Sequence, residues 1–402
     1  MATTHARLSP SSAVKWMACP ASVVLEAKCP DIPSAHADEG TAAHELAAMV
    51  LKGEWMSAYH AIGHVVYGHT VDEEMADYVH QYVGYVTSLL GTLYVEKALN
   101  IGAITGEPNA IGTADAVVVG GYLTIVDFKY GRGVKVEAND NPQLMLYGLA
   151  ALNTYRADFK CIKLVIFQPR INHVSEWEYS RGELAGFAIR VKLAADKSSN
   201  TIAWDEKFNY VRDGHFNPGT SQCRWCRAKP TCPGLRNRVL TTVADSPVDI
   251  NKPIAPQLEG IEDRDMDNAT LGNLLGSIDL IEDWCKAIRA KAKDVLFSGH
   301  DVPGFKLVRG KRGARQWVDE EKVQEAVFSM GTDISAQFIE SSFMSPAKAE
   351  ELIFKKCRIS PAQWTALQAH IIQPEGSAQI VPESDKRAPF SAVSRITDFQ
   401  PV

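Results

Sequence analysis

The sequence predicts a mixed α/β or α+β fold, with a central mixed sheet flanked by helices and a mostly helical C-terminal region. Two observations carry this prediction. Helical spacing of apolar residues dominates the chain up to about residue 95, and strand alternation then takes over. The later order of strand, strand, strand, helix and strand is typical of one sheet covered by helices.

The composition is that of an ordinary globular protein, with 46% hydrophobic and 22% charged residues in a chain of 402. This length suffices for two domains. No run of about 18 apolar residues occurs, so no segment is predicted to span a membrane. The opening MATTHARLSPSS lacks the apolar stretch of a secretory signal, and we therefore expect a cytoplasmic protein.

Charge and cysteine content narrow the function classes. The formal net charge of −6 gives no overall attraction to nucleic acid, so any DNA contact must come from local basic patches. Eight cysteines in a large cytosolic chain favour metal binding over disulfides.

The elements are predicted in the following order. The segment GTAAHELAAMVLKG is a helix with Thr41 as its candidate N-cap, ending at Gly53. Apolar residues three or four apart, from Met75 to Val86, predict a second helix. Strands are then expected at 93–101, 111–119, 122–130 and 161–170, with a helix at 141–155.

Composition shifts divide the chain into four parts. We expect a first domain over residues 1–240 and a linker, rich in proline and polar residues, over 241–262. Residues 263–375 are expected to form a mostly helical region with a basic segment. Residues 376–402 are expected to be a weakly ordered tail.

The strand in YLTIVDFKYGRG ends in a pattern that carries chemistry. Asp127 and Lys129 project from the same face, because strand side chains alternate. Asp115 lies on the preceding strand and Glu96 on the one before that. Converging carboxylates repel each other unless a cation such as Mg²⁺ or Mn²⁺ binds between them, and a nearby lysine can position a water. A surface ion pair is the simpler alternative.

The turn between these two strands tests the idea. A two-residue turn at Gly120 and Gly121 pairs Asp115 with Val126 and sends the two aspartates to opposite faces. A three-residue loop or one β-bulge returns them to the same face. The metal hypothesis therefore predicts an odd-length loop or a bulge at this turn.

Three further polar residues stand at helical positions. His44 lies one turn into its predicted helix and is either a half-buried histidine or a metal ligand. Gln143 and Tyr147 are four apart and share one helical face. They are either ordinary exposed residues or groups that hold a phosphate or a water.

Taken together, these motifs follow the order GTxxH, a glutamate strand, GxxD, DxK and QxxxY. This order resembles the RecB-like branch of the PD-(D/E)XK nuclease superfamily, and the chain is similar to a phage-encoded group of such nucleases. The motifs cover residues 9 to about 235, and the rest matches only the phage group. The motif positions are Gly40-Thr41 with His44, Glu96, Gly112 with Asp115, Asp127 with Lys129, and Gln143 with Tyr147.

The resemblance implies a restriction-endonuclease-like core and a role for each residue. Lys129 would activate or position the attacking water, and Gln143 and Tyr147 would orient DNA or the lysine. Glu96 would be a second-metal ligand or an outer-shell group. The acidic position of the DxK motif, two residues before Lys129, is the aspartate Asp127, where the superfamily more often has a glutamate. The implied ligands of Mg²⁺ or Mn²⁺ are His44, Asp115, Asp127 and the carbonyl of Phe128.

The segment CRWCRAKPTCPG holds Cys223, Cys226 and Cys232, and this spacing indicates a metal site. The fourth ligand is Cys19 or, as the rival, Cys29. Spacing alone allows a structural zinc. The resemblance implies a [4Fe-4S] cluster held by Cys19 and the three later cysteines. Such a cluster closes a loop of about 200 residues, which stabilises by about 5 kcal/mol on a loop-closure argument.

Two basic segments are candidate phosphate contacts in this acidic chain. Trp225 in the first or Trp317 in the second could stack on a base. The alternative is a pair of solvated charged loops. The candidate residues are Arg224, Arg227 and Lys229 beside the cysteines, and Lys306, Arg309, Lys311, Arg312 and Arg315 further along.

The leading hypothesis is a metal-dependent DNA nuclease, specifically an exonuclease acting on DNA ends or single strands in phage replication or recombination. Its expected partners are DNA and phage single-strand-binding or replication proteins, in the bacterial host cytoplasm. The alternatives are a catalytically silent DNA-binding or scaffold protein of a replication complex and a zinc-stabilised interaction module. An intact lysine at 129 favours the nuclease.

Overall fold

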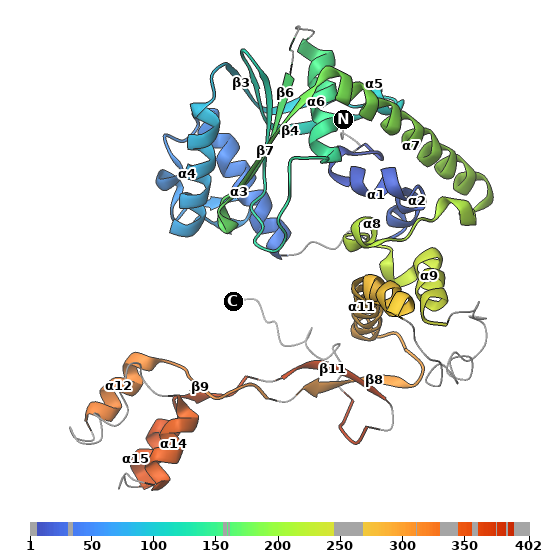
Figure 1. Cartoon of the computed structure of the whole chain (residues 1–402). Helices are drawn as coiled ribbons and strands as arrows, with labels where there is room; N and C mark the ends of the chain where they lie inside the picture. The colour runs from blue at the N-terminus through green and yellow to red at the C-terminus, as the bar shows by residue number, and fades with distance from the viewer. Residues whose placement is uncertain are drawn as a thin grey trace. The chain divides into compact units, whose positions relative to one another are not determined.

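The computed structural model describes residues 6–30, 35–155, 159, 161–244, 268–310, 312–329, 345–355, 361–374, 376–382 and 385–389. The chain divides into two compact units, Met1–Cys285 and Lys286–Val402. Figure 1 shows the helices and strands of both units.

A five-stranded mixed sheet forms the centre of the first unit, in the order β3-β4-β5-β6-β7. Strands β5 and β6 are parallel and every other neighbouring pair is antiparallel. This confirms the predicted mixed fold with a central sheet. The strands are β3 (Thr92–Asn100), β4 (Ile111–Val119), β5 (Leu123–Phe128), β6 (Cys161–Gln168) and β7 (His173–Ser180).

Helices cover both faces of this sheet, as Figure 1 shows. On one face lie α3 (Ala35–Leu51) and α4 (Glu73–Ser88); on the other lie α6 (Pro142–Tyr155) and the long α7 (Arg181–Phe208). The shorter helices are α1 (Ala13–Ala18), α2 (Ala21–Ala27), α5 (Gly102–Thr105), α8 (Thr220–Arg224) and α9 (Pro233–Ala244). Single-turn 3₁₀ helices are η1 (Pro10–Ser12), η2 (Ala58–Ala61), η3 (Pro169–Ile171), η4 (Asp213–His215) and η5 (Lys229–Thr231), and a small hairpin joins β1 (Val65–Val66) to β2 (His69–Thr70).

Alternation along the central strand sends successive side chains into two separate cores. Ile125 packs with Trp16 and the residues of α6 and α7, whereas the next residue, Val126, packs with Leu46 and Val79 of α3 and α4. All six residues of β5 are buried, as expected for a strand covered on both faces. The end of this strand is therefore rigid.

Local signals explain where several helices begin. Asp72 caps α4 by accepting the N–H of Met75 at 2.8 Å, and a capping box between Ser180 and Glu183 starts α7. The prediction that Thr41 caps its helix is wrong, because α3 already begins at Ala35.

The hairpin between β4 and β5 closes with three residues, 120–122. Its register pairs Val119 with Leu123 and Ala116 with Val126, and Gly120 N–H donates to the Tyr122 carbonyl at 3.0 Å. This confirms the odd-length loop that the sequence predicted.

The second unit is mostly helical, as predicted, but its described residues also form two small antiparallel sheets, which pair β8 with β11 and β9 with β10. Residues 376–382, expected to belong to a weakly ordered tail, form β11 instead. Of the expected linker, residues 241–244 end α9 and the rest lies outside the described residues. The elements are α11 (Asn268–Phe297), which crosses into this unit, β8 (Phe305–Gly310), β9 (Gln316–Trp317), α12 (Glu320–Phe328), α14 (Pro346–Lys355), α15 (Pro361–Gln368), β10 (Ile371–Ile372) and β11 (Gly376–Pro382).

Within the described parts of both units, no helix combines the length and apolar character that crossing a bilayer requires.

The hairpin loop generates a stability prediction. A Cβ added at Gly120 would lie 2.3 Å from the Leu90 carbonyl oxygen, whereas one added at Gly121 would meet nothing within 4 Å. We expect Gly120→Ala to lower the free energy of unfolding by about 1–3 kcal/mol, because backbone must move. Gly121→Ala is the matched control, and urea unfolding measures both. Equal stability of the two variants would contradict this account of the loop.

Candidate active site

The β4–β5 hairpin brings the two aspartates together. Because Ala116 pairs with Val126, the adjacent positions, Asp115 and Asp127, lie opposite each other. Asp115 Oδ2 accepts a hydrogen bond of 2.7 Å from the backbone N–H of Phe128. One carboxylate is therefore fixed against the strand that carries the other.

Lys129, Asp127 and Gln143 form a closed triangle of polar contacts. Lys129 Nζ lies 2.8 Å from Asp127 Oδ2 and donates a hydrogen bond of 3.0 Å to Gln143 Oε1. Gln143 Nε2 donates in turn to Asp127 Oδ1 at 2.8 Å. Since Gln143 lies in the first turn of α6, that helix holds the carboxylate and the lysine in one arrangement.

His44 and Glu96 approach the same point from other elements. His44 Nδ1, on α3, lies 3.4 Å from Asp115 Oδ1, and its ring centre is 5.1 Å from that of Phe128. The register of β3 and β4 places Glu96 opposite Asp115. The backbone φ of Glu96 is +49°, a left-handed value that is unfavourable for a residue other than glycine. Such strain clusters at functional sites.

Tyr82 belongs to this site although no motif marks it in the sequence. Its ring stacks on Phe128 at 4.4 Å, and it borders the small cavity that His44, Glu96 and Asp115 also border. Its hydroxyl is buried without a hydrogen-bond partner, and burial, with the charge of Asp115, raises its pKa well above the ordinary value. In the sequence Tyr82 falls within the apolar spacing of its helix, which indicates only a core residue.

Burial and close charges shift the pKa values of the site. Burial raises the pKa of Asp115, but the charge and hydrogen bond of His44 bring it below the ordinary value. The pKa of Asp127 stays raised, because burial and the charge of Asp115 outweigh the Lys129 ammonium. Burial lowers the pKa of His44 and of Lys129, yet the neighbouring aspartates raise both. Burial and Asp115 raise the pKa of Glu96.

These side chains offer the donors that a hard divalent cation prefers. The Phe128 carbonyl points toward Asp115, since the N–H and C=O of a strand residue face the same side. Asp127 Oδ2 is buried and accepts no well-aligned hydrogen bond, although Lys129 Nζ lies 2.8 Å away. Among the described residues, no three His, Cys, Asp or Glu side chains are already arranged to hold a metal ion. Each aspartate instead faces a basic side chain, His44 or Lys129.

Tyr147 connects this site to the N-terminal segment. A Cβ built on Gly112 would lie 3.0 Å from Tyr147 Cε1 and 2.8 Å from Pro10 Cγ, so only glycine permits this close approach. Burial and the charge of Asp127 raise the pKa of the Tyr147 phenol. The N-terminal segment therefore packs directly beside the candidate active site.

The four cysteines Cys19, Cys223, Cys226 and Cys232 border one small cavity. The sulfur atoms of the first, second and last each accept a backbone N–H at 3.4 Å. Burial raises the pKa of Cys223 and of Cys232, and it raises that of Cys226 to about 12. Burial therefore disfavours the free thiolates of these three cysteines, and a bound cation would offset that cost. Backbone N–H groups that donate to sulfur suit an iron–sulfur cluster or a zinc ion.

Cys29 does not border this cavity. Its Sγ donates to the Leu25 carbonyl at 3.3 Å, within its own helical turn. The geometry therefore favours Cys19 over Cys29 as the fourth ligand.

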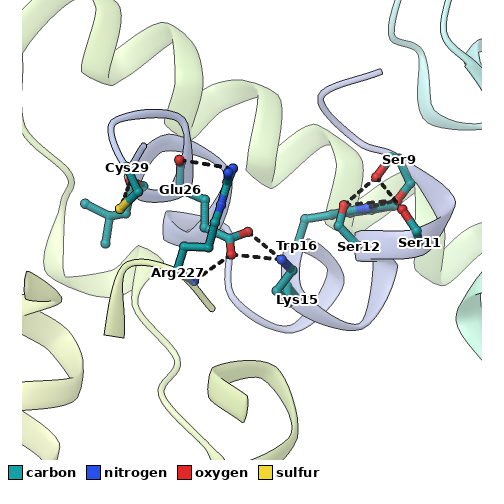
Figure 2. Close-up of polar contacts among 9 residues, drawn as sticks. Ser9, Ser11, Ser12, Lys15, Trp16, Glu26, Cys29 and Arg227 are labelled. Carbon is teal, nitrogen blue, oxygen red and sulfur yellow. Dashed lines mark hydrogen bonds and ion pairs between the residues drawn. The ribbon is translucent and has the colours of Figure 1, made fainter. Parts of the chain in front are cut away.

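Glu26 contacts both Lys15 and Arg227, as Figure 2 shows. Its carboxylate lies 2.7–2.8 Å from Lys15 Nζ and accepts the backbone N–H of Arg227 at 2.8 Å. Arg227 directly follows Cys226, and Glu26 lies on the helix that follows Cys19. This largely buried contact therefore joins the two chain segments.

The other basic residues near the cysteines contact their own loop. Lys229 Nζ donates to the Arg224 carbonyl at 2.6 Å, and the Arg224 guanidinium lies 5.8 Å from the Trp225 ring centre. The Trp225 side chain is 68% exposed. Lys229 thus borders the cysteine cavity, and an exposed indole lies in the same loop.

The second predicted basic patch lies in the second unit. Lys306 Nζ donates to the Asp385 carbonyl at 2.9 Å, and Arg315 forms an ion pair with Glu350. Arg309 is part of β8 and Arg312 is exposed. Lys311 lies outside the described residues.

Comparison with known proteins assigns a family without a function. Residues 5–388 match the family described as "Protein of unknown function (DUF2800)". A solved structure described as "Crystal structure of SSO0001" is 17% identical, with a TM-score of 0.26, and the match covers 56% of this chain and 84% of that one. Because this TM-score is low, the likeness does not bear on the fold or the function.

The cysteine cavity predicts which thiol is the fourth ligand. After anaerobic purification, we expect Cys19→Ser to lose most of the bound iron or zinc and Cys29→Ser to retain it. Metal analysis and visible absorbance measure the content and distinguish the two metals. Retention by the first variant together with loss by the second would reverse the assignment.

Glu26 generates a prediction about stability. We expect Glu26→Gln to lower the free energy of unfolding by about 3 kcal/mol, because it leaves the Lys15 ammonium largely buried without its carboxylate. The same variant should release its metal faster on dilution into chelator. Glu178→Gln, on the exposed side of the edge strand β7, is the control. Unchanged stability and metal retention would exclude this role for Glu26.

Proposed function

We propose a function for this chain, which belongs to the family described as "Protein of unknown function (DUF2800)": a metal-dependent DNA nuclease. The proposal includes the RecB-like PD-(D/E)XK resemblance, a restriction-endonuclease-like core and an exonuclease activity on DNA ends or single strands. It places the enzyme in phage replication or recombination, in the bacterial host cytoplasm. Phage single-strand-binding or replication proteins are its proposed partners.

One observation carries the proposal. Asp115 and Asp127 lie opposite each other in a buried hairpin, and Gln143 binds both Asp127 and Lys129. A buried pair of carboxylates is unfavourable unless positive charge lies beside it; Lys129 and His44 supply such charge here, and a divalent cation would engage both carboxylates at once. A surface ion pair, the simpler reading of the DxK pattern, would need neither the burial nor the glutamine.

The residues divide the work of phosphodiester hydrolysis. Asp115, Asp127, His44 and the Phe128 carbonyl would hold Mg²⁺ or Mn²⁺, which polarises a phosphate and lowers the pKa of water. As an ammonium group, Lys129 can donate hydrogen bonds to a water and to a phosphate oxygen while Asp127 and Gln143 fix its position.

Supporting residues keep this arrangement in place. Phe128 N–H holds the Asp115 carboxylate, and the Tyr82 ring covers Phe128 from the other side. Tyr147 would orient a DNA strand beside the N-terminal segment. Glu96, strained and close to Asp115, is the proposed ligand of a second metal or a group that holds the first. The four-cysteine site is proposed to carry a [4Fe-4S] cluster, with zinc as the alternative.

The test compares cleavage of linear single- and double-stranded DNA by anaerobically purified wild type and Lys129→Ala. We expect cleavage that requires Mg²⁺ or Mn²⁺ and falls by at least about 10²-fold in the variant. Lys192→Ala, an exposed change on α7, is the control and should cleave like wild type.

Two results would contradict the nuclease assignment. One is the absence of cleavage by folded, metal-loaded wild type on either substrate. The other is equal cleavage by wild type and Lys129→Ala. Retained DNA binding without cleavage would favour the silent scaffold protein instead.

A further inference from the structure

A second cavity, of about 620 Å³, lies outside the metal site. The N-terminal segment, α2, α7 and the loop after Cys226 border it. Its volume is in the range of about 300–1,000 Å³ that is typical of small-molecule sites. The side chains that matter here are Ser9, Ser12, Lys15, Ser22, Trp225 and Arg227.

The charges around the cavity favour an anionic ligand. Among the described residues, four cationic side chains and three carboxylates border it. Each of these carboxylates is within an ion pair, so its negative charge is balanced by a neighbouring cation. The ion pairs join Arg7 with Glu206, Lys15 with Glu26 and Lys28 with Asp205.

Hydroxyl groups supply hydrogen bonds on the opposite side, as Figure 2 shows. Ser9 Oγ lies 2.8 Å from Ser12 Oγ and 3.3 Å from Ser11 Oγ, and Trp16 Nε1 fixes the Ser9 carbonyl at 2.9 Å. Hydroxyls that bond one another can rotate toward an incoming phosphate or sugar.

Ser22 provides an independent sign of a ligand site. Ser22 is 4% exposed, and its hydroxyl has no hydrogen-bond partner. It borders this cavity as well as the cysteine cavity. A buried hydroxyl without a partner costs about 1–3 kcal/mol, which a polar ligand would recover.

The cavity has an aromatic rim and a short path to the active site. The exposed Trp225 indole offers a flat surface on which a base can stack. Pro10, between Ser9 and Ser12 in sequence, lies close to Gly112, as Tyr147 does. The turn η1 that carries Ser12 therefore packs near α6, which also holds Gln143.

We propose that this cavity binds one terminal nucleotide of a DNA strand, with its base on Trp225 and its phosphate between Arg227, Lys15 and the serine hydroxyls. The proposal rests on the proposed nuclease function, because it makes the cavity the anchor of the strand being cut. A free nucleotide shares this chemistry, and the experiment separates the two sources.

The experiment measures fluorescence anisotropy of a labelled single-stranded oligonucleotide with the full-length, cluster-loaded protein, without divalent metal so that no cleavage occurs. We expect Trp225→Ala to weaken binding by about 5- to 150-fold, the loss that one base–aromatic stack predicts. Trp225→Phe should restore most of it. Trp177→Ala, at a half-exposed tryptophan of β7, is the matched control and should bind like wild type.

A circular strand of the same sequence has no end, so it tests whether the strand end is the ligand. We expect the circular strand to bind more weakly than the linear strand. Equal binding of circular and linear strands, or equal binding by the Trp225→Ala and Trp177→Ala variants, would overturn the proposal. The proposal would also be overturned if the cavity bound free dTMP but not the oligonucleotide. If wild type still cleaves DNA in these cases, only the cavity assignment fails; if wild type neither binds nor cleaves DNA, both proposals fail.

Discussion

The three-residue loop between β4 and β5 is the constraint on which the rest of the site depends. With a two-residue loop, the Asp115 side chain would project from the opposite face of the sheet and could not lie beside Asp127. With three, two buried carboxylates lie opposite each other, and their repulsion must be balanced. Lys129, His44 and the hydrogen bond from Phe128 supply that balance in the protein itself. The same groups are the ones that a bound cation and a phosphate would engage.

The N-terminal segment connects the proposed active site with the cysteine site. Pro10 and Tyr147 both lie close to Gly112, and Cys19, nine residues after Pro10, borders the four-cysteine cavity. Glu26 then bonds the loop that follows Cys226, about 200 residues away in sequence. A metal bound by the four thiols would fix this segment, and the segment would fix the wall beside Tyr147. We therefore regard the cysteine site as structural support for the proposed active site and the DNA anchor.

Elements with strong periodicity could be predicted from the sequence, and those with mixed signals could not. Strands β3 to β6 and helix α6 follow from alternation and apolar spacing, whereas β7 is an exposed edge strand whose polar residues hide the pattern. Strand β8 could not be predicted, because it lies in a basic segment and pairs with β11, about 70 residues away in sequence. The sequence motifs identified most residues of the candidate active site. They could not show that Gln143 bonds Asp127, or that Tyr82 covers Phe128, because both contacts depend on how helices pack on the sheet.

The central claim is that Asp115 and Asp127 together bind a divalent metal ion. The most direct test is anomalous X-ray scattering from crystals of wild type and Asp115→Asn soaked in Mn²⁺. The account predicts a manganese peak within coordination distance of both carboxylates in wild type, and its loss in the variant. A crystal saturated with Mn²⁺ that has no peak between the two aspartates, or an equal peak in Asp115→Asn, would contradict it.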